Sequence, residues 1–154
     1  MYGNISEELE VKVSRREAWE IYSTLKLAKI MQSELPHLYI IDVLEGDGGV
    51  GTIIKVTPRP GVSVKPPFKE RFTKIDHEKM VKEVEIIEGG YLDLGCTSYR
   101  ITLEFIEKQN ENSSCIIRVT VEYEANEDAN CVVTAKPLMN ILKFVNEYIE
   151  NNKS

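Results

Sequence analysis

The stretch Tyr99-Arg100-Ile101-Thr102-Leu103-Glu104-Phe105 places apolar side chains at every odd position. The same alternation runs through Cys115–Tyr123, again with the odd positions apolar. Strict alternation predicts strands that bury one face and expose the other, because successive side chains of a strand point to opposite sides. Alternating runs of this kind continue from residue 68 to residue 123, so we predict that this part of the chain forms an antiparallel sheet.

Shorter elements precede these strands. Ser14 is followed three residues later by Glu17, a spacing typical of the start of a helix. Alternation and short apolar runs indicate further strands on either side of the helical segment. The sequence predicts a strand over Leu9–Val13, short helices over Arg15–Tyr22 and about Leu25–Ser33, and strands over Leu38–Val43 and Thr52–Thr57.

The last element is a long helix over about Asp128–Asn151. Its apolar residues recur at helical spacing, and Pro137 within the segment predicts a kink or a broken first turn. The apolar face consists of Leu138, Leu142, Val145 and Ile149, widened by Ile141, Phe144 and Tyr148. One strand, two short helices, six strands and one long helix define an α+β fold, in which the long helix lies across a curved antiparallel sheet.

Length, charge and cysteine content exclude several classes of protein. The 154 residues are the size of a single domain, residues 1–154, and 42% hydrophobic residues suffice for a core. A net charge of −6 without a basic run argues against nucleic acid and membrane partners, and no apolar stretch reaches the ~20 residues of a membrane span. The start of the chain lacks the features of a secretory signal. Cys96, Cys115 and Cys131 show no CxxC spacing, so we expect a reducing, cytoplasmic compartment.

Three other patterns carry little functional weight. Gly46–Gly51 resembles a phosphate-binding loop, but a predicted strand follows it, so we interpret it as a hairpin turn with positive φ angles. His37 and His77 lie far apart without a third ligand, so we expect no metal site. Tyr91 and Asp93 share a face, where they either line the floor of a pocket or complete the sheet, and we favour the second interpretation.

Polar side chains interrupt the apolar face of three predicted neighbouring strands. Parity places Glu70, Lys82 and Tyr99 on this face. The pair Gly89-Gly90 predicts a two-residue hairpin that sets Lys82 opposite Thr97 and makes Tyr99 its diagonal neighbour. The three polar residues therefore converge on one concave surface, whose apolar members include Phe68, Phe72, Val84, Ile86 and Ile101.

Two interpretations of this surface stay open. A buried carboxylate and a buried ammonium cost several kcal/mol each unless they are paired. The pair is therefore either a structural ion pair, with Lys82 reaching past the sheet edge, or part of a pocket. In a pocket, burial would raise the pKa of Glu70 and allow it to transfer protons.

The sequence resembles the pathogenesis-related class-ten, pollen-allergen-like family over almost its whole length. Glu45–Ile53 is similar to the glycine-rich loop of that family, and Ile87-Glu88-Gly89-Gly90-Tyr91-Leu92-Asp93-Leu94-Gly95 is nearly identical to the hairpin of its norcoclaurine synthase branch. The resemblance implies a helix-grip fold, in which a seven-stranded curved antiparallel sheet surrounds a long C-terminal helix and two short helices support it. A large ligand cavity would lie between them, with Leu138 and Leu142 on its helical wall.

Norcoclaurine synthases condense dopamine with an aldehyde by Pictet–Spengler chemistry, and their catalytic set is a Tyr, a Glu, a Lys and an Asp. The resemblance carries the Glu and the Lys over to Glu70 and Lys82, whereas Phe68 and Ile101 replace the Tyr and the Asp. This pattern of losses resembles the branch members that act later in benzylisoquinoline and morphinan alkaloid biosynthesis. An isomerase of that kind moves a double bond from the β,γ to the α,β position beside a ketone, as in the conversion of neopinone to codeinone.

Three functions follow as expectations. The first is a cofactor-independent isomerase in which Glu70 carries the proton and Lys82 or Tyr99 holds the dienolate oxygen. Its ligand would be a small hydrophobic alkaloid, bound by a monomer or homodimer against Phe68, Phe72, Val84, Ile86, Ile101, Leu138 and Leu142. The second is a non-catalytic carrier of hydrophobic plant metabolites, and the third is a condensing enzyme of the norcoclaurine synthase type.

Overall fold

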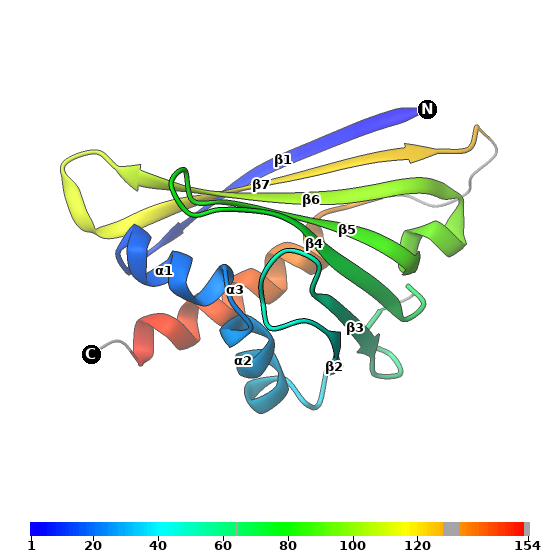
Figure 1. Ribbon diagram of the computed structural model, residues 1–154, viewed down its shortest axis with the longest axis horizontal. Helices are drawn as coiled ribbons and strands as arrows, with labels where there is room; N and C mark the ends of the chain where they lie inside the picture. Colours follow the sequence, from blue (N-terminus) through cyan, green and yellow to red (C-terminus); the bar gives the residue numbers. More distant parts are fainter. Residues whose placement is uncertain (64, 128–132, 153–154) are drawn as a thin grey trace.

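The computed structural model describes residues 1–63, 65–127 and 133–152. Seven strands form one antiparallel sheet in the order β1-β7-β6-β5-β4-β3-β2, and Figure 1 shows the three main helices on its concave side. The strands are β1 (Tyr2–Val11), β2 (Tyr39–Glu45), β3 (Ile53–Pro58), β4 (Phe68–Asp76), β5 (Val81–Gly89), β6 (Cys96–Lys108) and β7 (Glu111–Ala125). The helices are α1 (Arg15–Tyr22), α2 (Lys26–Glu34), the 3₁₀ helix η1 (Gly90–Leu94) and α3 (Lys136–Asn151). The predicted α+β architecture is confirmed.

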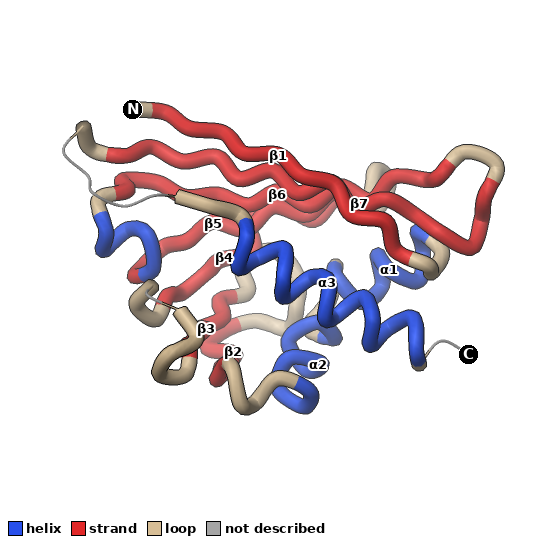
Figure 2. Tube along the Cα trace, turned by 180° about the vertical axis from the view of Figure 1, so that it is seen from behind, coloured by secondary structure: helices blue, strands red, loops and turns tan. Residues whose placement is uncertain are grey.

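Helix α3 lies across the concave face of the sheet (Figure 2). Its Leu142, Val145 and Ile149 are buried, and burial of such side chains contributes about 1.5–3 kcal/mol each. Phe144, which was predicted on the same face, is 40% exposed instead. Two residues along an α-helix correspond to a rotation of about 200°, so Phe144 points away from the sheet side that Leu142 occupies.

The start of α3 differs from the prediction. The helix begins at Lys136 rather than near Asp128, and residues 133–135 are not helical. Pro137 lies in the first turn, where its missing N–H has no intrahelical partner to lose, so the proline neither kinks nor breaks the helix. The earlier part of the predicted helix, residues 128–132 with Cys131, lies outside the described residues.

Local signals in the first half of the chain are confirmed. The hydroxyl of Ser14 accepts a hydrogen bond from the Glu17 backbone N–H at 3.1 Å and caps α1. The glycine-rich turn between β2 and β3 has positive φ angles at Gly46, Gly48 and Gly51.

Strand β1 starts seven residues earlier than predicted, at Tyr2. Its polar residues do not alternate with apolar ones, but they pair with β7.

The connection between β5 and β6 is not the predicted two-residue hairpin. Gly89 and Gly90 have positive φ angles, but they lead into η1. A Cβ atom at Gly89 would overlap the carbonyl oxygen of Pro67, so glycine permits the close approach of this turn to the start of β4. Lys82 consequently pairs with Leu103 instead of Thr97. The observed pairing differs from the predicted one by six residues. Because six is an even number, every β6 side chain lies on its predicted face.

Candidate functional site

A cavity of about 130 Å³ lies between the concave face of the sheet and helices α2 and α3. One water molecule needs ~10–15 Å³ of such volume, so the cavity is large enough to admit the ring of an aromatic ligand. The predicted residues that line it are Phe68, Glu70, Lys82, Val84, Ile86, Tyr99, Ile101, Leu138 and Leu142. The structure thus brings nearly all the predicted site residues together, whereas their catalytic and binding roles remain predictions.

A second chamber of about 40 Å³ adjoins the cavity toward α2 and β2. Phe72 lines this chamber and not the main cavity, which corrects its predicted position in the ligand-binding wall. Phe72 is 2% exposed, because its side chain packs into the core behind the cavity. Glu70 and Lys82 line both chambers, so the two ionisable groups lie where the chambers meet.

Lys82 is a buried lysine held at the end of a helix. The side chain is 3% exposed, and its Nζ donates a hydrogen bond of 2.7 Å to the carbonyl oxygen of Tyr22, the last residue of α1. Nζ also lies 3.7 Å from the centre of the Phe72 ring. Burial lowers the pKa of Lys82 to about 8, and the nearby Glu70 carboxylate opposes that shift. Both the ammonium and the neutral amine are therefore accessible near neutral pH.

The position of Lys82 depends on α1 and α3 as well as on its own strand. The Tyr22 hydroxyl donates a hydrogen bond of 2.9 Å to Oδ1 of Asn146, a buried residue of α3. The same tyrosine therefore links α3 through its side chain and Lys82 through its backbone. Carbonyl groups at a helix C-terminus carry partial negative charge, so this contact favours the ammonium form and limits the cost of burying it.

Glu70 faces the cavity without a partner. Among the described residues it makes no hydrogen bond and no ion pair within 4.0 Å, and Lys82 and Lys65 act on it only from a greater distance. Burial raises the pKa of Glu70, and the two lysines oppose that shift. A carboxyl group with a raised pKa and open access to a cavity has the properties of a general acid or base.

Tyr99 contributes a stacked aromatic pair to the cavity. Its ring lies on that of Tyr91, with centres 5.1 Å apart and planes inclined by 23°. Burial raises the pKa of Tyr99, so its hydroxyl stays neutral at physiological pH. Tyr91 also lines the cavity, and the interpretation that it only completes the sheet was wrong. Asp93, its predicted companion, is exposed in η1.

Several lining residues were missed by sequence reasoning. Lys65, which follows β3 in an irregular segment, and Tyr91, in η1, have no strand periodicity that would assign them to a face. Tyr39 belongs to β2, which the sequence predicted as a strand without assigning its side chains to a face. The proximity of all these residues is a consequence of tertiary packing.

Other site types find no support in the part of the chain that the structure describes. Residues 1–63, 65–127 and 133–152 contain no group of three His, Cys, Asp or Glu side chains able to hold a metal ion. Within the same ranges, no helix has both the length and the apolarity to cross a bilayer. Cys96 and Cys115 are buried, and neither forms a disulfide among the described residues.

Comparison with known proteins identifies the family. Residues 1–152 match the Pathogenesis-related protein Bet v 1 family. The chain belongs to this family. As a Bet v 1 protein it has the predicted helix-grip fold, and its resemblance to the norcoclaurine synthase branch is confirmed by individual relatives.

The most similar of these relatives are synthases. The chain is 46% identical to a norbelladine synthase of Narcissus pseudonarcissus over 158 aligned positions, which cover 100% of this chain and 96% of that protein. It is 36% identical to S-norcoclaurine synthase 2 of Papaver somniferum, over 94% of this chain but only 64% of that longer protein. The norcoclaurine synthase of Thalictrum flavum in complex with dopamine and hydroxybenzaldehyde superposes with a TM-score of 0.87 at 34% identity, covering 100% of this chain and 90% of that one.

Proposed function

We propose that this Bet v 1 protein condenses a primary arylethylamine with an aromatic aldehyde in plant alkaloid biosynthesis. The observation that carries the proposal is that Lys82 and Glu70 line the same cavity. The pKa of Lys82 is lowered to about 8, and Glu70 makes no hydrogen bond or ion pair among the described residues. Full-length similarity to a norbelladine synthase and to a structure holding dopamine and hydroxybenzaldehyde supports this choice over the predicted isomerase.

The two groups suit the proton transfers of imine formation. The amine nitrogen attacks the carbonyl carbon, the C–N bond forms, and the Glu70 carboxylate takes a proton from that nitrogen. The Lys82 ammonium donates a proton to the carbonyl oxygen, which becomes the hydroxyl of a carbinolamine. Glu70 then returns its proton to that hydroxyl, and water leaves. The neutral Lys82 amine takes the remaining proton from the nitrogen, so the products are the imine and one water molecule.

The apolar residues at two wall positions favour the open imine as the product. Ring closure would require the aromatic ring of the amine to attack the iminium carbon and then lose a ring proton. Phe68 and Ile101 offer no acid or base for these steps, and both line the cavity.

The test is the initial rate of condensation of dopamine with 4-hydroxybenzaldehyde, compared with the reaction without protein. Borohydride reduction before mass spectrometry separates the outcomes, because an imine takes up hydrogen and a ring-closed product of the same mass does not. We expect a protein-dependent imine that the Glu70→Gln and Lys82→Met variants form much more slowly. Equal rates with wild type, with both variants and without protein would contradict the proposal.

A double-bond isomerase is the second candidate, favoured by the raised pKa of Glu70 in a largely apolar cavity. Glu70 would take a proton from the carbon between ketone and alkene, Lys82 would hydrogen-bond the dienolate oxygen, and Glu70 would return the proton to the far carbon. A β,γ-unsaturated alkaloid ketone distinguishes the candidates, since isomerisation gives a product of unchanged mass and new retention time. A carrier would bind either ligand and return it unaltered.

A further inference from the structure

Lys65 is a third charged residue at the cavity, and neither proton-transfer scheme uses it. Its side chain is half-buried and lines the cavity beside Glu70. Nζ lies 5.0 Å from the ring centre of Tyr91 and 5.3 Å from that of Phe68. Among the described residues the Lys65 side chain has no hydrogen bond and no ion pair, although its backbone N–H donates to the Ser63 hydroxyl at 3.1 Å.

The charges at the cavity do not balance. Lys65, Glu70 and Lys82 are the charged residues among the described lining residues, which gives two cations for one carboxylate. Burial lowers the pKa of Lys65, and Glu70 opposes the shift. An anionic oxygen bound in this cavity would restore the balance and would interact more strongly than in water, because the surroundings are poorly polarisable.

The two lysines lie on opposite sides of Glu70 along β4. Lys65 is placed over the ring of Phe68, whereas Lys82 is placed over that of Phe72. The two aromatic residues are four positions apart on one strand, so their backbones are separated by about 13 Å. A ligand that lies along β4 would therefore have Lys65 near one end and Lys82 near the other, with Glu70 between them.

We propose that Lys65 binds the ring oxygen of a hydroxylated aromatic aldehyde as its phenolate, which makes Lys65 a specificity-determining residue for the aldehyde. This inference rests on the proposed condensation. An aldehyde group conjugated through the ring makes a para hydroxyl more acidic than an ordinary phenol, so this substrate supplies the anion that the cavity lacks. An ammonium-bearing amine, by contrast, is repelled by both lysines and is better placed beside Glu70.

The orientation that follows is productive. With the phenolate at Lys65, the carbonyl carbon of a para-hydroxybenzaldehyde points toward Glu70 and Lys82. The aromatic faces of Phe68 and Tyr91 flank the Lys65 end, where they can pack against the bound ring. Lys65 thus selects the hydroxyl group, and Lys82 acts on the aldehyde group.

Spectroscopic titration tests this binding mode without turnover. The probe is 4-hydroxybenzaldehyde, whose phenolate absorbs at longer wavelength than its phenol, and benzaldehyde is the control ligand. We expect wild type to lower the pH at which the bound probe ionises. Removing a charge-assisted hydrogen bond should weaken binding of the probe roughly 10–100-fold in Lys65→Met and leave benzaldehyde binding unchanged.

Two variants serve as controls. Lys65→Arg keeps the charge and should retain the spectral shift, and Lys69→Met removes a lysine that pairs with Glu88 outside the cavity, so it should bind like wild type. If Lys65→Met fails to fold, Lys65→Gln takes its place. Unchanged ionisation and affinity of the probe in the Lys65 variants would overturn the proposal. A spectral shift without any condensation would instead refute the proposed function and leave the phenolate site standing.

Discussion

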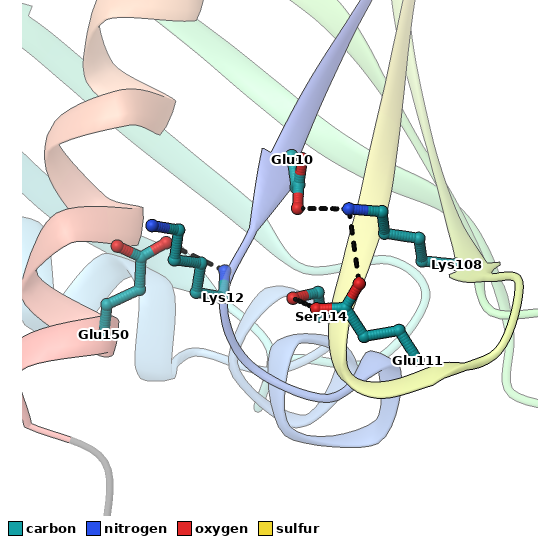
Figure 3. A network of polar contacts seen from close by, with 6 residues as sticks. All are labelled: Glu10, Lys12, Lys108, Glu111, Ser114 and Glu150. Carbon is teal, nitrogen blue, oxygen red and sulfur yellow. Dashed lines mark hydrogen bonds and ion pairs between the residues drawn. The ribbon is translucent and has the colours of Figure 1, made fainter.

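Two groups of charged residues in this protein show opposite electrostatics. The first lies at the ends of β1, β6 and β7, where Lys108 Nζ is 2.7 Å from Glu10 Oε1 and 3.3 Å from Glu111 Oε2 (Figure 3). The second lies in the cavity, where Glu70 has no ion pair among the described residues and Lys82 donates to a backbone carbonyl. The first group is exposed and paired, whereas the second is enclosed and largely unpaired.

The pKa shifts of the two groups run in opposite directions. Hydrogen bonds to carboxylates raise the pKa of Lys108, and hydrogen bonds from Ser114 and Lys108 lower the pKa of Glu111. Burial instead lowers the pKa of Lys82 and raises that of Glu70. The surface therefore favours the charged forms, and the cavity favours the neutral ones. Ionisable side chains whose burial lowers the stability of the fold are characteristic of sites that bind or transform a ligand.

The largest effect that should follow from this contrast is on turnover in Glu70→Gln. Glutamine keeps the shape of the side chain but cannot exchange a proton, so the initial condensation rate should fall by roughly 10²–10⁴-fold. The free energy of unfolding at pH 7 should not fall, because burial already opposes the charged form of Glu70. Stopped-flow rates and urea unfolding measure the two quantities, and wild-type rates in Glu70→Gln would place the proton transfer elsewhere.

The pH dependence of kcat/KM should reflect the ionisation of both Glu70 and Lys82. Activity should rise with pH through a pKa above the ordinary 4.5 of Glu70, as the base forms, and fall above about 8, as Lys82 loses its proton. Each limb should change tenfold per pH unit far from the optimum. Lys82→Arg stays protonated and cannot give up a proton, so most of the activity should be lost, and the rate that remains should lack the alkaline limb. The ionisation of the amine substrate is the same in both proteins, so an alkaline limb that stays would not belong to Lys82.

Replacement of the buried lysine should stabilise the fold. Lys82→Met removes a charge whose burial is unfavourable, and we expect a gain of about 1–3 kcal/mol in the free energy of unfolding at pH 7. Because the folded pKa of about 8 lies below the ordinary 10.5, the unfolded chain binds more protons between these values. Stability of wild type should therefore rise with pH across that window and approach that of Lys82→Met. A less stable Lys82→Met at pH 7 would show that the contact with Tyr22 outweighs the burial cost.

The smallest effect should come from the surface group. Lys108→Met removes the lysine that joins Glu10 and Glu111 (Figure 3), and exposed ion pairs contribute little to stability. The condensation rate and the thermal midpoint should both stay within error of wild type. A large loss of activity would break the contrast between the two groups, because it would connect the surface network to the cavity.

Sequence periodicity was sufficient to predict which side chains face inward. Alternation is a local property, so parity alone placed Glu70, Lys82, Tyr99 and Ile101 on one face, even though the predicted pairing of Lys82 was wrong by six residues. An error of an even number of residues leaves every face unchanged. Helical spacing likewise identified Leu138 and Leu142 as residues that face the sheet.

The contacts that those side chains make depend on the tertiary structure. Lys65 and Tyr91 belong to irregular or 3₁₀ segments, where no period assigns a direction, and α1 brings the Tyr22 carbonyl to Lys82 from a distant part of the chain. The apolar pattern placed the start of α3 too early, whereas in the structure the helix begins at Lys136. The charge balance of the cavity is thus a property of long-range packing, because Coulomb interactions depend on distances in space that sequence periodicity does not contain.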